Sequence, residues 1–207
     1  MRRSRAASRR RTLVQKVETG SALIHRFDGA LHPDLCARLC ALIRGRTARA
    51  AEDIDGSKLP WHDSDTFSYE RWDDAELRRL VGAYRIMVSQ FICLSFRQVV
   101  FPHFTDLVLW RPGKKMAEHK DDGYAHDGDT LKCRHYSAVT YCNDDYSGGE
   151  TFIRNEHGDY YLSRPKTGSV VFYPSDERAT HGVNEVIGAD RVTLSTWYTR
   201  DYNHYRP

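Results

Sequence analysis

The spacing of apolar residues changes along the chain, from a helical period in the first half to short alternating runs in the second. A first helix is expected from His32 to Gly45, and its apolar residues recur at helical spacing, namely Leu35, Leu39, Leu42 and Ile43. A second helix is expected from Asp73 to about Phe96. Asp73 and Glu76, three residues later, would form a capping box at its start. Its apolar stripe consists of Leu77, Leu80, Val81, Tyr84, Val88, Phe91 and Leu94. Both helices are expected to brace one face of a β-core.

Short β-rich runs separated by turn residues begin at residue 104. About eight strands are expected, over residues 104–110, 116–121, 134–143, 150–153, 159–163, 169–173, 181–186 and 191–199. A hairpin about Gly188 and Ala189 would join the last two and place Arg191 opposite Val186. The pattern indicates a mainly β, double-sheet fold with flanking helices.

A long polar segment, residues 51–72, separates the two helices and contains the aromatic residues Trp61, Phe67, Tyr69 and Trp72. Because structureless loops of this length in compact domains are usually functional, the segment is a candidate lid over a substrate. The alternative is that its aromatic side chains pack on the flank of the β-core. The pattern alone leaves both interpretations open.

Length and composition indicate one domain over residues 15–207, with helical support over 32–98 and a β-core over 104–201. The segment 1–14 is expected to be a disordered tail, because residues 1–11 hold six arginines and no acid. Such a tail could instead contact nucleic acid or anionic lipid, or act as an organellar transit segment. Without these arginines the formal charge falls from +3 to −3, so a nucleic-acid surface on the folded body is not favoured.

No apolar run approaches the roughly 18 residues that a membrane span requires, so a soluble protein is expected. The five cysteines contain no CxxC pair and follow no secretory segment, which favours a cytoplasmic location. Cys36 and Cys40 lie one helical turn apart and are interpreted as small core residues. The sequence does not indicate an oligomeric state.

Three residues carry the candidate metal chemistry: His119 and Asp121 form a His-x-Asp step, and His181 follows far downstream. Side chains two apart on an extended segment share a face, so the first two can converge on one ion while Lys120 points away. Two imidazoles and one carboxylate form the ligand set of a facial triad, which leaves three positions open on Fe(II). A structural zinc site would instead be closed by four ligands, usually including cysteine.

Arg191 extends this hypothesis to a co-substrate. In the expected hairpin it would lie about 16 Å along the strand from His181, a gap that a metal-chelating five-carbon diacid could fill. The guanidinium fork suits the far carboxylate, and Thr193 shares the face of Arg191 and can add a hydroxyl. The inferred co-substrate is 2-oxoglutarate.

The segment from about Leu107 to Asp201 resembles the 2-oxoglutarate and Fe(II)-dependent dioxygenases of the prolyl 4-hydroxylase-like branch. Besides the residues above, it carries the motifs Tyr-Cys-Asn-Asp (141–144), Gly-Gly-Glu-Thr (148–151), Gly-Ser-Val-Val-Phe (168–172) and Arg-Val-Thr-Leu-Ser-Thr-Trp (191–197). The resemblance implies a double-stranded β-helix, or jelly-roll, with Fe(II), 2-oxoglutarate and dioxygen at one mouth and ascorbate as an optional reductant. It also implies hydroxylation of an unactivated C–H bond, with release of succinate and carbon dioxide.

Two positions depart from that branch. Met116 stands where members often have a co-substrate-binding tyrosine, so Tyr141 or Tyr173 would have to supply the hydroxyl. Arg191 stands where the branch more often has lysine, although arginine is common in the wider superfamily. Asp121 argues against halogenation, because related halogenases have a small residue in its place.

Other histidines compete with this assignment. His157-Gly158-Asp159 is a second His-x-Asp step, but its glycine and acid are typical of a hairpin turn. His126 and His135 lie in or beside the loop 122–133 and are interpreted as solvated loop residues, with contact to a substrate as the alternative. The remaining histidines have no partner spacing.

The expected substrate is an amino acid, a peptide or protein residue, or a natural-product intermediate. A nucleic-acid demethylase of the same superfamily is an alternative, although that branch ends in Arg-x5-Arg and here Arg191 is followed by Arg200. A non-catalytic, cupin-like metal-binding protein is the alternative of another class. Formation of succinate separates an enzyme from a binding protein.

Overall fold

A computed structural model describes residues 13–50, 64–123 and 131–207 of the chain. The strands are β1 (Gln15–Val17), β2 (His25–Asp28), β3 (Asp65–Ser68), β4 (Phe101–Trp110), β5 (Met116–His119), β6 (Tyr136–Tyr141), β7 (Ser147–Gly148), β8 (Thr151–Arg154), β9 (Tyr160–Ser163), β10 (Val170–Pro174), β11 (His181–Val183), β12 (Val186–Ile187) and β13 (Arg191–Thr199). The helices are α1 (Pro33–Ala50), α2 (Ala75–Phe96) and the short 3₁₀ turns η1 (Tyr69–Arg71), η2 (Glu177–Ala179) and η3 (Tyr202–His204).

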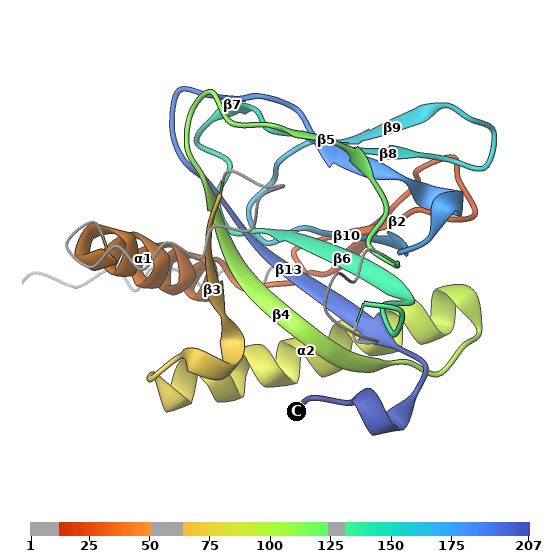
Figure 1. The fold of residues 1–207 in the computed structure, drawn as a ribbon, viewed down its shortest axis with the longest axis horizontal. Coiled ribbons are helices and arrows are strands. Elements are labelled where there is room, and N and C mark those ends of the chain that lie inside the picture. The colour runs from red at the N-terminus through yellow and green to blue at the C-terminus, as the bar shows by residue number, and fades with distance from the viewer. Residues whose placement is uncertain (1–12, 51–63, 124–130) are drawn as a thin grey trace, which may run out of the picture.

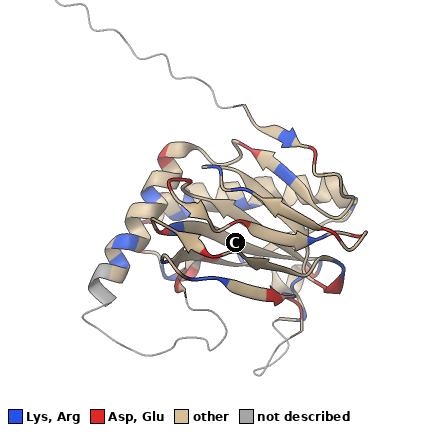
Figure 2. Ribbon diagram, turned by 90° about the horizontal axis from the view of Figure 1, so that it is seen from above, with Lys and Arg blue, Asp and Glu red and all other residues tan. Residues whose placement is uncertain are grey.

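Two antiparallel sheets form the body of the molecule. The large sheet has the strand order β1-β2-β10-β6-β13-β4-β3, and the small one has the order β5-β11-β8-β9. Both helices lie on one side of the large sheet, and the small sheet lies on the other (Figure 1). The expected fold class, mainly β with flanking helices, is confirmed. Charges of both signs are distributed over the helices and strands (Figure 2).

The large sheet has two chemically different faces because its strands alternate side chains. On β4, Leu107 and Leu109 are fully buried in the core shared with the helices. Their neighbours Asp106, Val108 and Trp110 point to the opposite face and line a cavity beneath the small sheet. Each fully buried aliphatic side chain contributes roughly 1.5 to 3 kcal/mol, so the helical face stabilises the sheet while the other face is available for chemistry.

The helices differ from the prediction at four positions. Helix α1 continues through Gly45 to Ala50, and Arg46 beyond that glycine lies over the ring of Phe67 at 4.0 Å. The cap of α2 is Asp74, whose side chain accepts a hydrogen bond from the Leu77 amide at 2.9 Å, and not Asp73. A glycine within a helix costs little enough for tertiary contacts to override it.

The capping-box role predicted for Glu76 and the buried position predicted for Leu94 are also wrong. The Glu76 carboxylate pairs with Arg38 of α1 at 3.0 Å, so it ties the two helices together instead of closing a capping box. Leu94 is 81% exposed, whereas Ile92 is fully buried. Seventeen residues after Leu77, a side chain has turned roughly 100° away from it around the helix, so Leu94 leaves the buried stripe.

The hairpin predicted about Gly188 is wrong. Strand β11 pairs with β5 and β8 in the small sheet, whereas β13 pairs with β4 and β6 in the large one. Arg191 therefore lies opposite Trp110, and Val186 pairs with Gly148 in the two-stranded β12–β7 ladder. The segment that carries Gly188 crosses between sheets, a long-range choice that local turn residues do not reveal.

The N-terminal part supplies more than helices. Strands β1 and β2 precede α1, and β2 and β3 pair directly with β10 and β4 of the large sheet. The expected separation of a helical support from a later β-core is wrong to that extent. Within the segment 51–72, Phe67, Tyr69 and Trp72 are buried in the helical core, which favours packing for these three. Trp61 and the rest of the candidate lid lie outside the described residues.

None of the five cysteines forms a disulfide, and Cys36 and Cys40 are buried in the core as expected. The described ranges contain no helix with the length and apolar character of a bilayer span. The tail 1–14 lies almost wholly outside the described residues, so its role stays a prediction.

His103 gives the fold a pH-dependent stability. Its ring is fully buried on β4, and burial followed by the charges of Arg206 and Arg134 lowers its pKa to about 4. The folded chain disfavours the protonated ring. The contribution of the neutral ring to the free energy of unfolding is therefore complete above pH 6.5 and is lost as the pH falls towards 4. Between pH 7.5 and pH 4.5 the loss is roughly 2 kcal/mol.

His103→Gln should therefore reduce the difference between the unfolding free energies at pH 7.5 and pH 4.5, measured by urea titration. His157→Gln, which removes an exposed histidine, is the control and should leave that difference unchanged. An equal difference in the wild type and His103→Gln would show that the buried ring does not couple folding to pH.

Candidate metal centre

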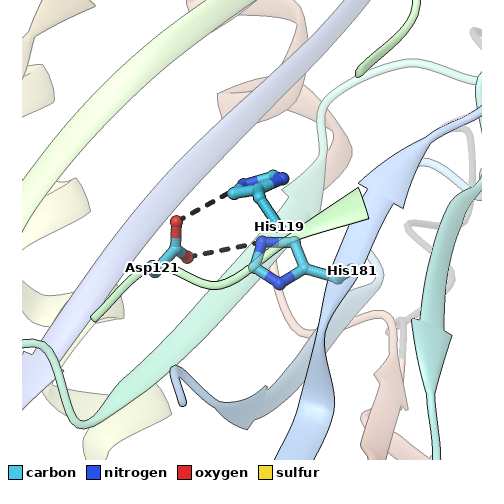
Figure 3. Close-up of side chains that lie close together, drawn as sticks. All are labelled: His119, Asp121 and His181. Carbon is cyan, nitrogen blue, oxygen red and sulfur yellow. Dashed lines mark ion pairs between the residues drawn. The ribbon is translucent and has the colours of Figure 1, made fainter. Parts of the chain in front are cut away.

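The small sheet brings the three predicted ligands together. His119 ends β5, Asp121 follows two residues later, and His181 begins β11 directly opposite His119 in the antiparallel register. One ligand atom from each lies within 4.8 Å of the other two. The side chains point towards one another, with Asp121 facing both imidazoles (Figure 3). The Asp121 carboxylate lies 3.6 Å from Nε2 of His119 and 3.4 Å from Nε2 of His181.

Neighbouring groups hold the Asp121 carboxylate in place. The backbone amides of Asp121 and Asp122 both donate to the Ser175 carbonyl, at 2.9 and 3.0 Å. The Ser137 hydroxyl donates to Oδ2 of Asp121 at 2.5 Å, and the Ser175 hydroxyl lies 2.7 Å from that of Ser137. Sequence reasoning missed Ser137, because its position on β6 becomes relevant only when the two sheets stack.

The charge state of the cluster suits a cation. Burial by itself would raise the pKa of Asp121, but the charge of His181 and hydrogen bonds from both histidines hold it well below its usual range. Burial lowers the pKa of His119, but the bonded Asp121 carboxylate outweighs it and the net shift is upward. Nδ1 of His119 lies 2.9 Å from the Ala117 carbonyl, so a proton there leaves Nε2 free to bind a metal. The donor set fits Fe(II).

A cavity of about 90 Å³ lies between the sheets beside this cluster. Besides the three ligands its wall contains Ser64, Thr66, Asp106, Val108, Trp110, Met116, Ser137, Ala138, Val139, Thr151, Tyr173, Val183, Arg191, Ser195, Thr196 and Trp197. The structure therefore places Arg191 in the same cavity as His181, although the two residues belong to different sheets. The two residues line one cavity, although the hairpin from which their spacing was predicted does not form.

Arg191 is a buried cation, with 2% of its surface exposed. Its guanidinium donates to the Gly149 carbonyl at 2.9 Å and to the hydroxyls of Thr151 and Thr193 at 3.1 and 3.4 Å. All three acceptors are neutral, so the positive charge faces the cavity without a carboxylate among these partners. A buried positive charge with only neutral acceptors favours the binding of an anionic ligand.

Gly149 allows the Arg191 side chain to approach closely. A Cβ atom added there would lie 3.1 Å from Cδ of Arg191 and 2.8 Å from the Tyr146 ring. The residue also has a φ of +63°, which glycine adopts most readily. The Gly-Gly step of the sequence motif therefore makes room for the cation.

Two tyrosines were candidates for the hydroxyl missing at Met116. The Tyr141 hydroxyl is already engaged, because it donates to the Ser163 carbonyl at 2.6 Å and lies 2.9 Å from the Thr151 hydroxyl. Tyr173 lines the cavity, and its ring centroid lies 4.6 Å from that of His181. Among the described residues, the buried Tyr173 hydroxyl has no hydrogen-bond partner. Tyr173 is thus better placed to contact a ligand, whereas Tyr141 and Thr193 support the groups around Arg191.

The alternative histidines lie elsewhere. His157 and Gly158 form the turn between β8 and β9, with Gly158 at a φ of +87°, as the hairpin interpretation predicts. His135 lines a separate polar cavity of about 290 Å³ with Arg134 and Arg200. His126 lies outside the described residues.

The comparisons with known proteins agree with this geometry. The sequence model of the 2OG-Fe(II) oxygenase superfamily matches residues 97–199, about half of the chain. Rat prolyl 3-hydroxylase 2 is 37% identical over 71 residues, which are 33% of this chain and 10% of that protein. The chain thus spans only a small part of the curated relatives it matches.

Solved structures show the same fold over most of the chain. A prolyl-4-hydroxylase from Pseudomonas putida is similar with a TM-score of 0.70 and 22% identity, covering 86% of this chain and 92% of that one. A prolyl hydroxylase from Trichoplax adhaerens, solved with a hypoxia inducible factor peptide, gives 0.68 and 13%, covering 87% and 85%. The expected jelly-roll core is confirmed.

The matched motifs, the shared fold and the converging donor set have one common explanation. The family implies Fe(II) as cofactor and 2-oxoglutarate and dioxygen as co-substrates, as predicted. This chain belongs to the 2OG-Fe(II) oxygenase superfamily, and its fold is similar to that of prolyl hydroxylases.

Proposed function

We propose that this chain hydroxylates an unactivated C–H bond in a residue of a peptide or protein, with conversion of 2-oxoglutarate and dioxygen to succinate and carbon dioxide. The observation that carries the proposal is the convergence of two histidines, one aspartate and a buried arginine on one cavity. The catalytic unit would be the single domain 15–207.

Three residues would hold the metal: His119, Asp121 and His181. These three ligands would leave other coordination positions of the ion open. When bound, Fe(II) supplies the redox chemistry that activates dioxygen for attack on the C–H bond. The protein's own contribution is to orient the ligands, through the Ala117 carbonyl at His119 and the Ser137 hydroxyl at Asp121, and to exclude water between the sheets.

Arg191 would bind the distal carboxylate of 2-oxoglutarate, since that carboxylate provides the anion that its buried charge lacks. Thr193 and Tyr141 would hold the guanidinium and its partner Thr151 in position. Tyr173 would donate its free hydroxyl to the same co-substrate and so replace the tyrosine hydroxyl that is absent at Met116. This arrangement fixes the co-substrate at one end of the cavity.

The substrate class rests on similarity. The curated relatives are named prolyl 3-hydroxylases, and one solved neighbour was crystallised with a peptide. A prolyl residue in a peptide or protein is therefore the first substrate to test, ahead of free amino acids and natural-product intermediates. Metal binding without succinate formation would instead indicate the non-catalytic, cupin-like alternative.

His181→Ala should abolish Fe(II)-dependent formation of succinate and the mass gain of one oxygen in proline-containing peptides, because two ligands no longer hold the ion. The matched control is His157→Ala, which removes the histidine of the second His-x-Asp step and should retain activity. Thermal unfolding checks that both variants fold. Activity in His181→Ala, or its loss in His157→Ala alone, would contradict the ligand assignment.

Ser137→Ala should weaken metal binding, because it removes the hydroxyl that orients the Asp121 carboxylate. Loss of such a supporting group typically lowers metal affinity about 10- to 100-fold. Anaerobic titration with Fe(II) or Co(II) measures the change. Ser195→Ala, which alters the same cavity without a contact to Asp121, is the control, and equal affinities for both variants would refute the role of Ser137.

Arg191→Ala should raise the KM for 2-oxoglutarate by about 10- to 100-fold, since hydrogen bonds to a charged group contribute about 1.5 to 3 kcal/mol. Arg191→Lys keeps the charge but loses the fork, so its KM should lie between those of the wild type and the alanine variant. Arg111→Ala, at a half-exposed arginine, is the control. An unchanged KM in a folded Arg191→Ala protein would exclude this role.

A further inference from the structure

A second cavity lies close to the candidate centre and has no role in the proposed function. Its volume is about 290 Å³, and the charged residues of its described wall are Asp122, Lys132, Arg134, Asp176, Arg178 and Arg200. Asp122 directly follows the metal ligand Asp121, which lines the first cavity. A polar space of this size beside the metal cluster can take a polar group of a ligand.

The acidic residues of this wall are already paired with cations. The Arg178 guanidinium donates to both oxygens of Asp176 at 2.7 to 3.0 Å. Nζ of Lys120 lies 3.3 Å from Oδ1 of Asp122. Burial and then the charge of Arg200 lower the pKa of His135, so this ring is neutral at pH 7 in a positive environment. The wall therefore favours an anion over a cation.

The Arg134 side chain connects the second cavity with the first. Its Cζ lies 3.9 Å from the centroid of the Trp197 ring, and Trp197 lines the metal cavity. The buried Nε–H of Arg134 and the buried Nε1–H of Trp197 both lack an acceptor among the described residues. Two neighbouring donors of this kind need an explanation, and a ligand that brings acceptor oxygens provides one.

The positive charge of Arg134 is only partly compensated by the protein. Burial lowers its pKa, and the Asp121 and Asp106 carboxylates oppose that shift through their charge, without a hydrogen bond. Asp121 is a proposed metal ligand, so a bound cation would take up its negative charge and would itself repel Arg134. An additional anion beside Arg134 is therefore favoured most strongly in the metal-loaded protein.

The position of Arg134 indicates which ligand brings that anion. Trp197 is six residues, roughly 20 Å, along β13 from Arg191, so the distal carboxylate of 2-oxoglutarate is held away from Arg134. Trp197 also pairs with Ser137 on β6, whose hydroxyl donates to the metal ligand Asp121. An anion at Arg134 thus lies beside the metal, where the reacting part of the substrate must lie.

We propose that Arg134 is a specificity-determining residue that binds a carboxylate of the substrate, and that the second cavity receives this part of the substrate. The inference rests on the proposed function of the metal centre. It narrows the substrate to a peptide or amino acid with a carboxylate close to the hydroxylated carbon. That carboxylate is either the main-chain carboxylate of the hydroxylated residue or an acidic side chain next to it.

The test compares probes that differ only in charge. N-acetylproline and N-acetylprolinamide test a main-chain carboxylate. The N-acetylated dipeptide amides of prolyl-glutamate and prolyl-glutamine, and of glutamyl-proline and glutaminyl-proline, test an acidic side chain. Their affinities for the full chain, loaded with Zn(II) and 2-oxoglutarate, are measured by NMR titration at low salt. The wild type should bind the carboxylate member of at least one pair about tenfold more tightly, the effect of one charge-assisted hydrogen bond.

The indole N–H groups report where the probes bind. The carboxylate member of the preferred pair should shift the Nε1–H resonance of Trp197, because that ring lies against Arg134. The matched internal control is Trp72, whose Nε1–H donates to the Phe67 carbonyl in the helical core and should not respond. A preference that leaves the Trp197 resonance unchanged would contradict the proposed place of binding.

Two variants separate this charge from charge in general. Arg134→Gln removes the charge beside Trp197 and should abolish the preference. Arg79→Gln removes an exposed charge on α2, on the other side of the large sheet, and should retain it. Equal binding within every pair by the wild type, or a preference that survives in Arg134→Gln, would overturn the inference. If Arg134→Gln fails to fold, the wild-type comparison and the Trp197 resonance decide the question.

Two other results identify a different role or a different failure. Weaker binding of 2-oxoglutarate by Arg134→Gln, with equal binding within every pair by the wild type, would assign Arg134 to the co-substrate and overturn the inference. Iron-dependent succinate formation tests the oxygenase separately, since the charge preference is measured without turnover. A carboxylate preference without any succinate would contradict the proposed function alone, and succinate without a preference would contradict the role of Arg134 alone.

Discussion

The antiparallel pairing of β11 with β5 is the contact on which the candidate centre depends. It places His181 opposite His119, and the chain leaving β5 then brings Asp121 between them. The backbone of Asp121 is anchored on Ser175 and its carboxylate on Ser137, so the ligand that follows the strand is as well fixed as those on it. A ligand set held in this way needs little rearrangement when a cation binds, which is what a preorganised site requires.

The large sheet serves two purposes because its strands alternate. Leucine residues on one face pack against α1 and α2, and the other face presents polar and charged residues to the cavity. The cost of burying a cation there is reduced by three neutral acceptors around Arg191. A bound anion would remove most of the remaining cost of burying this charge. A guanidinium with only neutral acceptors is therefore evidence that the cavity takes an anionic ligand.

The cavity is polarised along β13. Arg191 marks one end and Asp106, opposite Ser195, marks the other. The wall of the cavity therefore carries opposite charges at separate positions along the large sheet.

The sequence by itself determined the chemistry and the larger elements. His119 and Asp121 share a face because alternation is local, and the extent of α2 follows from its apolar period. The sequence did not determine which strands pair, so the hairpin about Gly188 was predicted wrongly and β2 and β3 were missed. It also could not single out Ser137 or decide between Tyr141 and Tyr173. Their roles arise when two sheets stack and bring distant strands within a few ångströms, a long-range packing choice that local propensity does not encode.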